Sequence, residues 1–317
     1  MTLTIAALLF LIGYASQRSG VCMVRAVREV VERRRVHRIA GFALAAASAT
    51  LLMAAAELAG ARPFATILGA MPDALALAGG VVFGVGALIS GQCAIGTLAA
   101  LTAGELSRLG AIAAMFIAAL LLGPNMSGAA LMLPERSATI SPLADRPALA
   151  IGVGAALAVL AAIYIYRRLG WKRPRGGWSP LIAMPLIGAA SGALFALDLH
   201  WVYTSQLAAL AQGALPLTLA TFLTPMPLII GMLIAARIGG MQHWRWGSLR
   251  DWALAVIGGL LMGLGATLVP GGNDTMLFTG VPLLLPNLLA AYAAFFVTLV
   301  LGLYLRPGRR RVMPVHE

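Results

Sequence analysis

Long apolar runs separated by short polar or basic segments form the dominant pattern of this chain. A helix needs about 20 apolar residues to cross a bilayer. Nine runs approach that length with few charges: Ile5–Ser16, Ile39–Leu58, Ala74–Ile89, Leu109–Gly123, Ala148–Tyr166, Leu181–Leu197, Pro216–Ala236, Trp252–Val269 and Leu288–Leu305. The pattern predicts an all-α, polytopic transmembrane protein.

The composition agrees with that prediction. Of the 317 residues, 60% are hydrophobic and 11% are charged, whereas soluble domains carry about 25% charged residues. The first charged cluster follows the first apolar run instead of preceding it, so a cleavable signal peptide is not expected. No folded segment outside the membrane is apparent, and a soluble enzyme is therefore not expected.

The formal net charge of +12 raises the question of nucleic-acid binding. The basic residues, however, gather in loops beside the predicted spans, as the positive-inside rule describes. These loops are Val24–Arg38, Tyr166–Gly177, Arg237–Arg250 and Arg306–Arg311. We predict that they are cytoplasmic and that no nucleic acid is bound. The connection Pro124–Pro147, whose charges nearly cancel, is predicted on the outer side.

The chain contains an internal repeat. Gly79–Leu98 and Gly258–Leu277 share a Gly-Gly pair, a following Gly-x-Gly and the same apolar run, and one extra residue aligns Cys93 with Asn273. This repeat predicts a division into four parts: a first transmembrane repeat (1–166), a basic cytoplasmic linker (167–178), a second transmembrane repeat (179–305) and a basic tail (306–317).

If both basic loops Arg25–Arg38 and Arg237–Arg250 are cytoplasmic, the two matching elements cross the membrane in opposite directions. Inverted repeats of this kind are typical of transporters, whose sites lie near the midplane at interrupted helices. Each interruption opens a helix N-terminus, whose free N–H groups attract anions. Glycine and proline mark interruptions at Ser19-Gly20, Ser90-Gly91-Gln92 and Val269–Asp274, the last of which contains Gly271 and Gly272. Thr204–Gln206 is a weaker counterpart of the Ser16–Cys22 region.

The two cysteines of the chain, Cys22 and Cys93, each follow a Ser-Gly pair. A buried cysteine often only fills space, but a thiol at a helix N-terminus is polarised and reactive. Two thiols without a neighbouring histidine or carboxylate do not complete a zinc site, and no methionine clustering favours Cu(I). No metal or other cofactor is expected. A disulfide would need Cα atoms within about 7 Å, which the sequence leaves open.

Asp274 follows Pro-Gly-Gly-Asn in the second repeat element. An ionisable residue at membrane depth is typically functional, and an aspartate at this position would also serve as a helix N-cap. Both interpretations remain open. The spacings Gly80–Gly84 and Gly259–Gly263 are typical of close helix packing.

Two stretches of the chain resemble the YeeE/YedE family of bacterial inner-membrane proteins, which take up thiosulfate or related sulfur compounds. They are "GYASQRSGVC" and "GVGALISGQCAIGTLAALTAGE", with the elements Ser-Gly-x-Cys and Gly-Gln-Cys-x-x-Gly-Thr. The resemblance implies that Cys22 and Cys93 pass the anion through S–H hydrogen bonds. Where well-known members carry another cysteine, this chain has Asn273 and Asp274.

We therefore expect a multi-pass inner-membrane permease, and no enzyme, for thiosulfate or a related small sulfur-containing anion. The expected substrate path comprises Cys22, Cys93, Ser19, Gly20, Gly91, Gln92, Gly271, Gly272, Asn273 and Asp274. The family association adds a soluble sulfur carrier of the TusA type as a partner. The alternative is a membrane redox or sulfur-transfer protein that uses Cys22 and Cys93 as a disulfide or persulfide pair.

Overall fold

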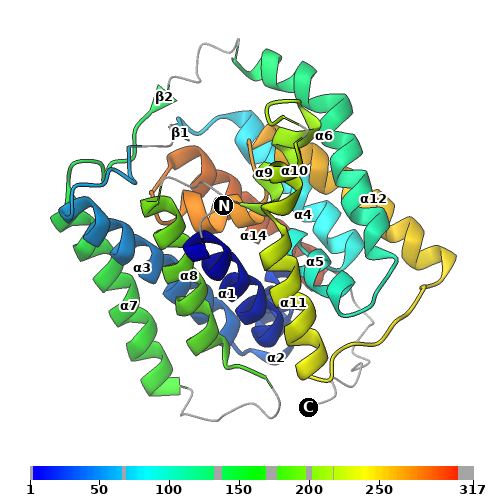
Figure 1. The fold of residues 1–317 in the computed structure, drawn as a ribbon, viewed down its shortest axis with the longest axis horizontal. Coiled ribbons are helices and arrows are strands. Elements are labelled where there is room, and N and C mark those ends of the chain that lie inside the picture. Colours follow the sequence, from blue (N-terminus) through cyan, green and yellow to red (C-terminus); the bar gives the residue numbers. More distant parts are fainter. Residues whose placement is uncertain are drawn as a thin grey trace.

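The computed structural model describes residues 3–65, 69–131, 138–168, 177–197, 202–216 and 218–305 (Figure 1). The helices before the linker are α1 (Leu3–Ser19), α2 (Met23–Arg33), α3 (His37–Leu58), α4 (Ala74–Ser90), α5 (Ala94–Thr102), α6 (Arg108–Leu131) and α7 (Pro147–Arg168). After it come α8 (Pro180–Ala196), α9 (Tyr203–Ala211), α10 (Leu219–Leu223), α11 (Met226–Ile238), α12 (Leu249–Leu268), α13 (Asn273–Thr275), which runs into a π-helical turn (Met276–Gly280), and α14 (Pro286–Tyr304). Two short strands, β1 (Gly69–Ala70) and β2 (Ala138–Thr139), pair antiparallel.

The all-α polytopic class is confirmed. Within the described residues, six stretches are long and apolar enough to cross a membrane: Leu3–Arg33, His37–Leu58, Ala74–Thr102, Thr221–Ile238, Leu249–Leu268 and Pro286–Tyr304. Shorter apolar stretches in α6, α7 and α8 match the remaining predicted spans. Most of the basic linker and the whole basic tail lie outside the described residues, as do Glu135 and Arg136 of the predicted outer connection.

One sequence-based prediction is wrong. The basic segment Val24–Arg38 was predicted as a loop, but its first part forms α2. This highly charged segment is an amphipathic helix. Met23, Val24 and Val27 are buried, while Arg25 and Arg28 are exposed. A helix that buries only one narrow face does not need an apolar run.

Described parts of three basic segments lie near the end of α1, toward the bottom of Figure 1. The backbone N–H of Trp178, just after the linker, donates to the Arg18 carbonyl at 3.1 Å. A Cβ placed on Gly239, at the end of α11, would lie 2.5 Å from the Arg18 guanidinium. The Arg38 guanidinium at the start of α3 donates to the Ser19 carbonyl at 2.9 Å. These contacts bring four helix termini to the same end of the bundle: the ends of α1 and α11 and the starts of α3 and α8.

The two repeat elements pack against each other as α4 and α12. A Cβ on Gly265 would lie 2.7 Å from the Gly79 carbonyl oxygen, and one on Gly258 would lie 2.7 Å from that of Gly86. From the first of these contacts to the second, the residue number rises along α4 and falls along α12, so the two helices run antiparallel. Only glycine permits this approach, because any side chain would meet the facing backbone.

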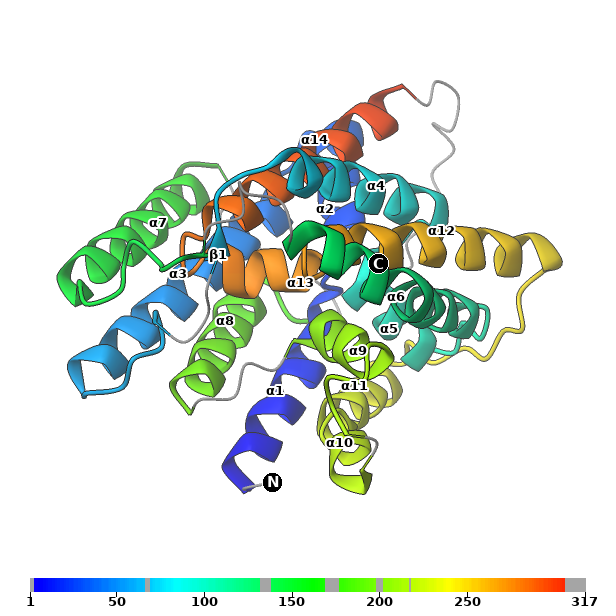
Figure 2. The same ribbon diagram turned by 90° about the horizontal axis from the view of Figure 1, so that it is seen from above.

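The second glycine row of each element packs on the other half of the chain. Gly80 of α4 faces the Ala291 backbone of α14, and Gly259 of α12 faces the Ala111 backbone of α6. Figure 2 shows α4 beside α14 and α12 beside α6. The predicted packing role of the Gly80–Gly84 and Gly259–Gly263 spacings is confirmed. The partner positions 111 and 291 differ by 180, the same offset that aligns Cys93 with Asn273.

Candidate functional site

Cys22 lies at the break between α1 and α2. Gly20 ends α1 with φ of 64°, and Cys22 occupies the N-cap of α2 in an extended conformation. A positive φ favours glycine, so the Ser-Gly pair ends the first helix and the thiol opens the second. The side chain of Cys22 is buried, with 2% of its residue surface exposed.

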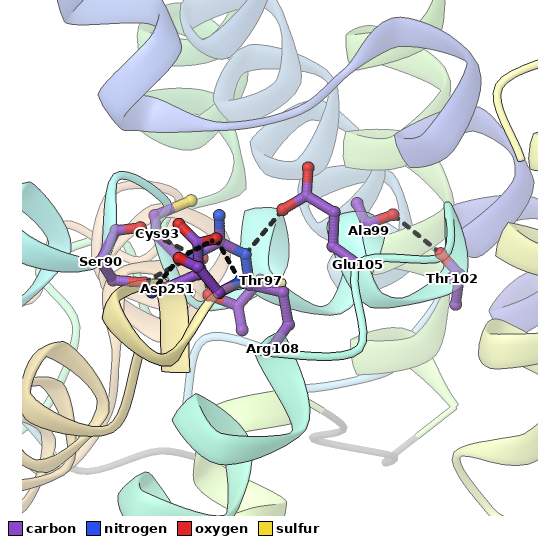
Figure 3. A network of polar contacts seen from close by, with 9 residues as sticks. Ser90, Cys93, Thr97, Ala99, Thr102, Glu105, Arg108 and Asp251 are labelled. Carbon is purple, nitrogen blue, oxygen red and sulfur yellow. Dashed lines mark hydrogen bonds and ion pairs between the residues drawn. The ribbon is translucent and has the colours of Figure 1, made fainter. Parts of the chain in front are cut away.

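Cys93 occupies the same position at the next break. Gly91 ends α4 with φ of 74°, and Cys93 is the N-cap of α5. Only 1% of its residue surface is exposed. In Figure 3 the Cys93 thiol lies at the start of α5, with Ser90 beside it. Both cysteines therefore stand where a helix leaves four N–H groups without partners.

An arginine binds the carbonyl side of each of these two breaks. Arg38 donates to the carbonyls of Ser19 and Gly20 at 2.9 and 2.8 Å. Arg108 donates to the Ser90 carbonyl at 2.8 Å (Figure 3).

Each of these arginines also has an acidic partner. Arg38 pairs with Glu29 at 3.2 Å, and Arg108 pairs with Glu105 at 2.9 Å. Each guanidinium is thus held in place while it compensates the negative end of the helix that stops at the break.

The two thiols meet between the starts of α2 and α5. Both are free thiols, and they lie within hydrogen-bonding reach of each other. The Cys22 sulfur faces the backbone N–H groups of Arg25 and Cys93, and the Cys93 sulfur faces those of Gly96 and Met23. Neither thiol makes a capping hydrogen bond to its own helix. The N–H groups of Met23, Arg25 and Gly96 at the two helix starts therefore face the sulfur pair, and a thiol is only a weak acceptor for them.

Gly96 and Gln92 complete the surroundings of the thiols. A Cβ on Gly96 would lie 2.8 Å from the Cys22 sulfur and 2.9 Å from Gln92 Oε1. The absence of a side chain at Gly96 lets the Cys22 sulfur rest on α5. Gln92 Oε1 is buried, and no hydrogen-bond partner for it is found among the described residues.

Asn273 connects this pair of helix starts to the second half of the chain. Its Oδ1 accepts a hydrogen bond of 3.3 Å from the N–H of Ala94, the first residue of α5. The Asn273 side chain therefore connects the break at Gly271 and Gly272 with the break at Gly91. A ligand that binds the Ala94 N–H has to compete with this amide oxygen.

Asp274 turns away from the thiols, toward the start of α9. Its Oδ2 accepts from the Thr204 N–H at 3.0 Å, and its Oδ1 accepts from the Thr204 hydroxyl. The same hydroxyl accepts from the Gly272 N–H at 2.9 Å. Asp274 thus satisfies the start of a helix 70 residues earlier in the chain instead of capping its own. It is buried, with 1% of its surface exposed.

A cavity of about 40 Å³ lies beside Asp274, between the two halves of the chain. Its polar lining consists of Asp274, Tyr203 of α9, Ser16 of α1 and Ser191 of α8. Its remaining walls are aliphatic or aromatic. Two of the lining helices, α1 and α8, occupy the first position of their halves.

The structure brings most of the predicted site residues together. Cys22, Cys93 and Gln92 are adjacent, and Asn273 reaches the start of α5. Ser19, Gly20 and Gly91 shape the breaks, while Gly271 and Gly272 lead into α13. Asp274 contacts the start of α9, so the predicted convergence extends to a fourth helix start.

Sequence reasoning did not single out four positions that contact the helix breaks: Arg38, Gly96, Arg108 and Thr204. Gly96 lies inside the Gly-Gln-Cys-x-x-Gly-Thr element, where its spacing from Cys93 was the available signal. Thr204 was noted only within a weak counterpart of Ser16–Cys22. Val202 is the N-cap of α9, as Cys22 is of α2, so Thr204 lies in the first turn of α9.

The chain belongs to the sulphur-transport family, whose family model matches residues 18–303. The match includes both cysteine breaks and extends through the second repeat element into α14. The resemblance to the YeeE/YedE family is thereby confirmed. Among curated protein sequences, none matches the chain.

Proposed function

We propose that this chain carries thiosulfate, or a closely related small sulfur-containing anion, across the bacterial inner membrane along a path that passes Cys22 and Cys93. One observation carries the proposal: two free, buried thiols meet between the starts of α2 and α5. A helix N-terminus carries about half a positive charge. Two of them facing one point attract an anion without a lysine at that depth.

The thiols supply the selectivity in this proposal. Sulfate would satisfy backbone N–H donors as well as thiosulfate does. A thiol is a weak donor and a soft, polarisable group, which suits a terminal sulfur better than a fourth oxygen. Cys22 and Cys93 are placed to contact that sulfur, while the Ala94 N–H, released from Asn273, binds an oxygen.

The architecture in this proposal is an inverted repeat, with halves at 1–166 and 179–305. The antiparallel contact between α4 and α12 and the reciprocal packing on α14 and α6 support it. The common end of the basic segments is assigned to the cytoplasm by the positive-inside rule. The exposed Arg25 and Arg28 of α2 lie beside the Cys22 break, where an acidic surface of a soluble sulfur carrier of the TusA type would dock and receive the cargo.

The experiment is uptake of ³⁵S-labelled thiosulfate into proteoliposomes, compared with labelled sulfate and sulfite. We expect uptake of thiosulfate in the parent and its loss in Cys22→Ala and Cys93→Ala at equal reconstitution. Unchanged uptake in both variants would reduce the thiols to a packing role. No uptake of any of the three anions by the parent would contradict the transport proposal itself.

A second candidate is a redox or sulfur-transfer function, favoured by the contact between the two thiols. In that case one thiolate would attack the outer sulfur of thiosulfate, which forms a persulfide and releases sulfite as the S–S bond breaks. The other thiolate would then attack the persulfide, which forms the Cys22–Cys93 disulfide and releases hydrosulfide. Mass spectrometry of protein quenched with a thiol-blocking reagent during uptake separates the two candidates. A pure permease keeps both thiols free, whereas the alternative leaves a modified fraction that grows with turnover.

A further inference from the structure

Asp274 stands in an unusual setting for a carboxylate. It is 1% exposed, and the ion pairs found among the described residues involve Glu29 and Glu105 but not Asp274. The groups that face it are the Thr204 N–H and hydroxyl, together with other neutral groups of Tyr203 and Thr275. A buried charge that no cation pairs is costly and typically functional.

A cavity large enough for water lies beside this carboxylate. One water needs about 10–15 Å³ of such space, so the cavity of about 40 Å³ has room for about three. Ser16, Ser191 and Tyr203 line it beside Asp274. The Tyr203 hydroxyl is buried, and no hydrogen-bond partner for it is found in the described part of the chain. The site therefore has polar groups that water can join into a chain.

The hydrogen bonds that the Asp274 carboxylate already accepts favour the binding of a proton over that of a metal ion. The two Asp274 oxygens accept the N–H and O–H of Thr204 and also face the backbone N–H groups of Asp274 and Thr275, so few of their lone pairs stay open. A proton needs one such lone pair. A small metal cation instead needs several oxygens at once, and the described lining offers this carboxylate and three hydroxyls among apolar walls. Of the cavity-lining residues, only Asp274 and Tyr203 titrate, and no described lysine, arginine or histidine is among them.

Asp274 is linked to the proposed anion path because it directly follows Asn273 in the sequence. Asn273 binds the Ala94 N–H at the start of α5, and Asp274 binds Thr204 at the start of α9. An anion that takes the Ala94 N–H displaces the Asn273 side chain and so shifts the neighbouring carboxylate.

We infer that Asp274 is the proton-binding site of a proton–anion symport, and that the water-sized cavity beside it is the route by which the proton arrives. The inference rests on the proposed transport function and adds its coupling ion. In each cycle Asp274 takes one proton from water on the side where the anion enters and releases it to water on the other side. No electrons are transferred. The proton offsets part of the charge that an anion carries into a negative interior.

The test measures two fluxes in the same proteoliposomes made with the full-length chain: uptake of ³⁵S-thiosulfate and acidification of the lumen, read with a trapped pH dye. For the parent we expect proton entry with thiosulfate. An inside-alkaline gradient of one pH unit should raise the accumulation ratio about tenfold for each coupled proton, because one pH unit is a tenfold ratio of proton activity. Asp274→Asn should lose proton entry and the effect of the gradient, whereas Asp274→Glu should keep both. Asp251→Asn, the same change at an exposed aspartate, is the control and should match the parent.

The outcomes separate the two proposals. Thiosulfate uptake by the parent without proton entry would overturn the inference and leave the transport function standing, as would unaltered coupling in Asp274→Asn. If the parent moves no thiosulfate, the transport proposal fails. The symport then fails with it, and infrared difference spectra of the purified protein test the proton-binding step by itself: a carboxyl band that responds to pH and is missing in Asp274→Asn supports proton binding at Asp274, and its absence in the parent overturns it.

Discussion

Replacing Gly96 by alanine tests whether the position of the Cys22 thiol controls transport. The new Cβ would lie 2.8 Å from the Cys22 sulfur and 3.1 Å from the Cys22 Cβ. Ordinary contacts between heavy atoms are about 3.5–4.0 Å, so the thiol has to retreat by about 1 Å. Cys22 is 2% exposed, so the movement displaces buried neighbours.

Two opposing terms set the effect on stability. Overpacking a buried site costs about 1–3 kcal/mol, while alanine in place of glycine stabilises a helix by up to about 1 kcal/mol. The expected net loss in the free energy of unfolding is about 0–3 kcal/mol, less than the total stability of a typical folded protein. Transport should suffer more. A hydrogen bond to a charged group contributes about 1.5–3 kcal/mol, and 1.4 kcal/mol is a factor of ten. Thiosulfate uptake should therefore fall at least about tenfold.

The assay combines thiosulfate uptake in proteoliposomes with the rate at which a small maleimide alkylates Cys22. Gly152→Ala in α7 is the matched control, because a Cβ there meets nothing within 4 Å. It should keep uptake, alkylation and stability at parental levels or slightly raise stability. If Gly96→Ala transports thiosulfate and reacts with maleimide at the parental rates, the thiol is not held against α5 as described, and the reasoning is refuted.

Three further predictions follow from the same geometry. Cys22→Ser and Cys93→Ser should lower thiosulfate uptake more than any sulfate uptake, measured in parallel; equal losses would contradict the role of the soft sulfur. Arg108→Gln should weaken the apparent affinity for thiosulfate several-fold, and Arg108→Lys should restore part of it. If the glutamine variant keeps the parental dependence of uptake on thiosulfate concentration, Arg108 has no electrostatic role in binding the anion. Gly80→Ala and Gly259→Ala should each destabilise the detergent-solubilised protein by about 1–3 kcal/mol, and a thermal shift in only one of them would argue against equivalent packing in the two halves.

The spans and the helix breaks could be predicted from the sequence because they depend on local composition. Apolar runs locate helices in a membrane protein through one-dimensional hydropathy, and each Ser-Gly pair before a cysteine marks a break by its backbone preference. The helix α2 could not be found in this way. Met23, Val24 and Val27 form its buried face, and the charges between them dominate any average over the segment.

The pairing of the helix starts could not be predicted, because it depends on contacts between distant parts of the chain. A helix N-cap was one of the two interpretations left open for Asp274, and the helix start that it binds belongs to α9. Asn273 likewise reaches a residue 179 positions away. Such partners are chosen by the packing of the two halves, which local propensity does not encode. The cavity between the two halves could not be predicted from the sequence either, because it depends on the same packing.

The arginines at the cysteine breaks resolve an electrostatic difficulty in the anion path. A broken helix places the negative end of one segment beside the positive end of the next, and the two half-charges nearly cancel at a short distance. Arg38 and Arg108 bind the carbonyls of the negative ends at both cysteine breaks. The N–H groups of α2 and α5 then dominate the field at the thiols. At the start of α9 the opposite arrangement holds, because the carboxylate of Asp274 takes the N–H group itself. These two arrangements fit the two proposals: an anion path at the thiols in the first half of the chain, and a proton-binding carboxylate in the second half.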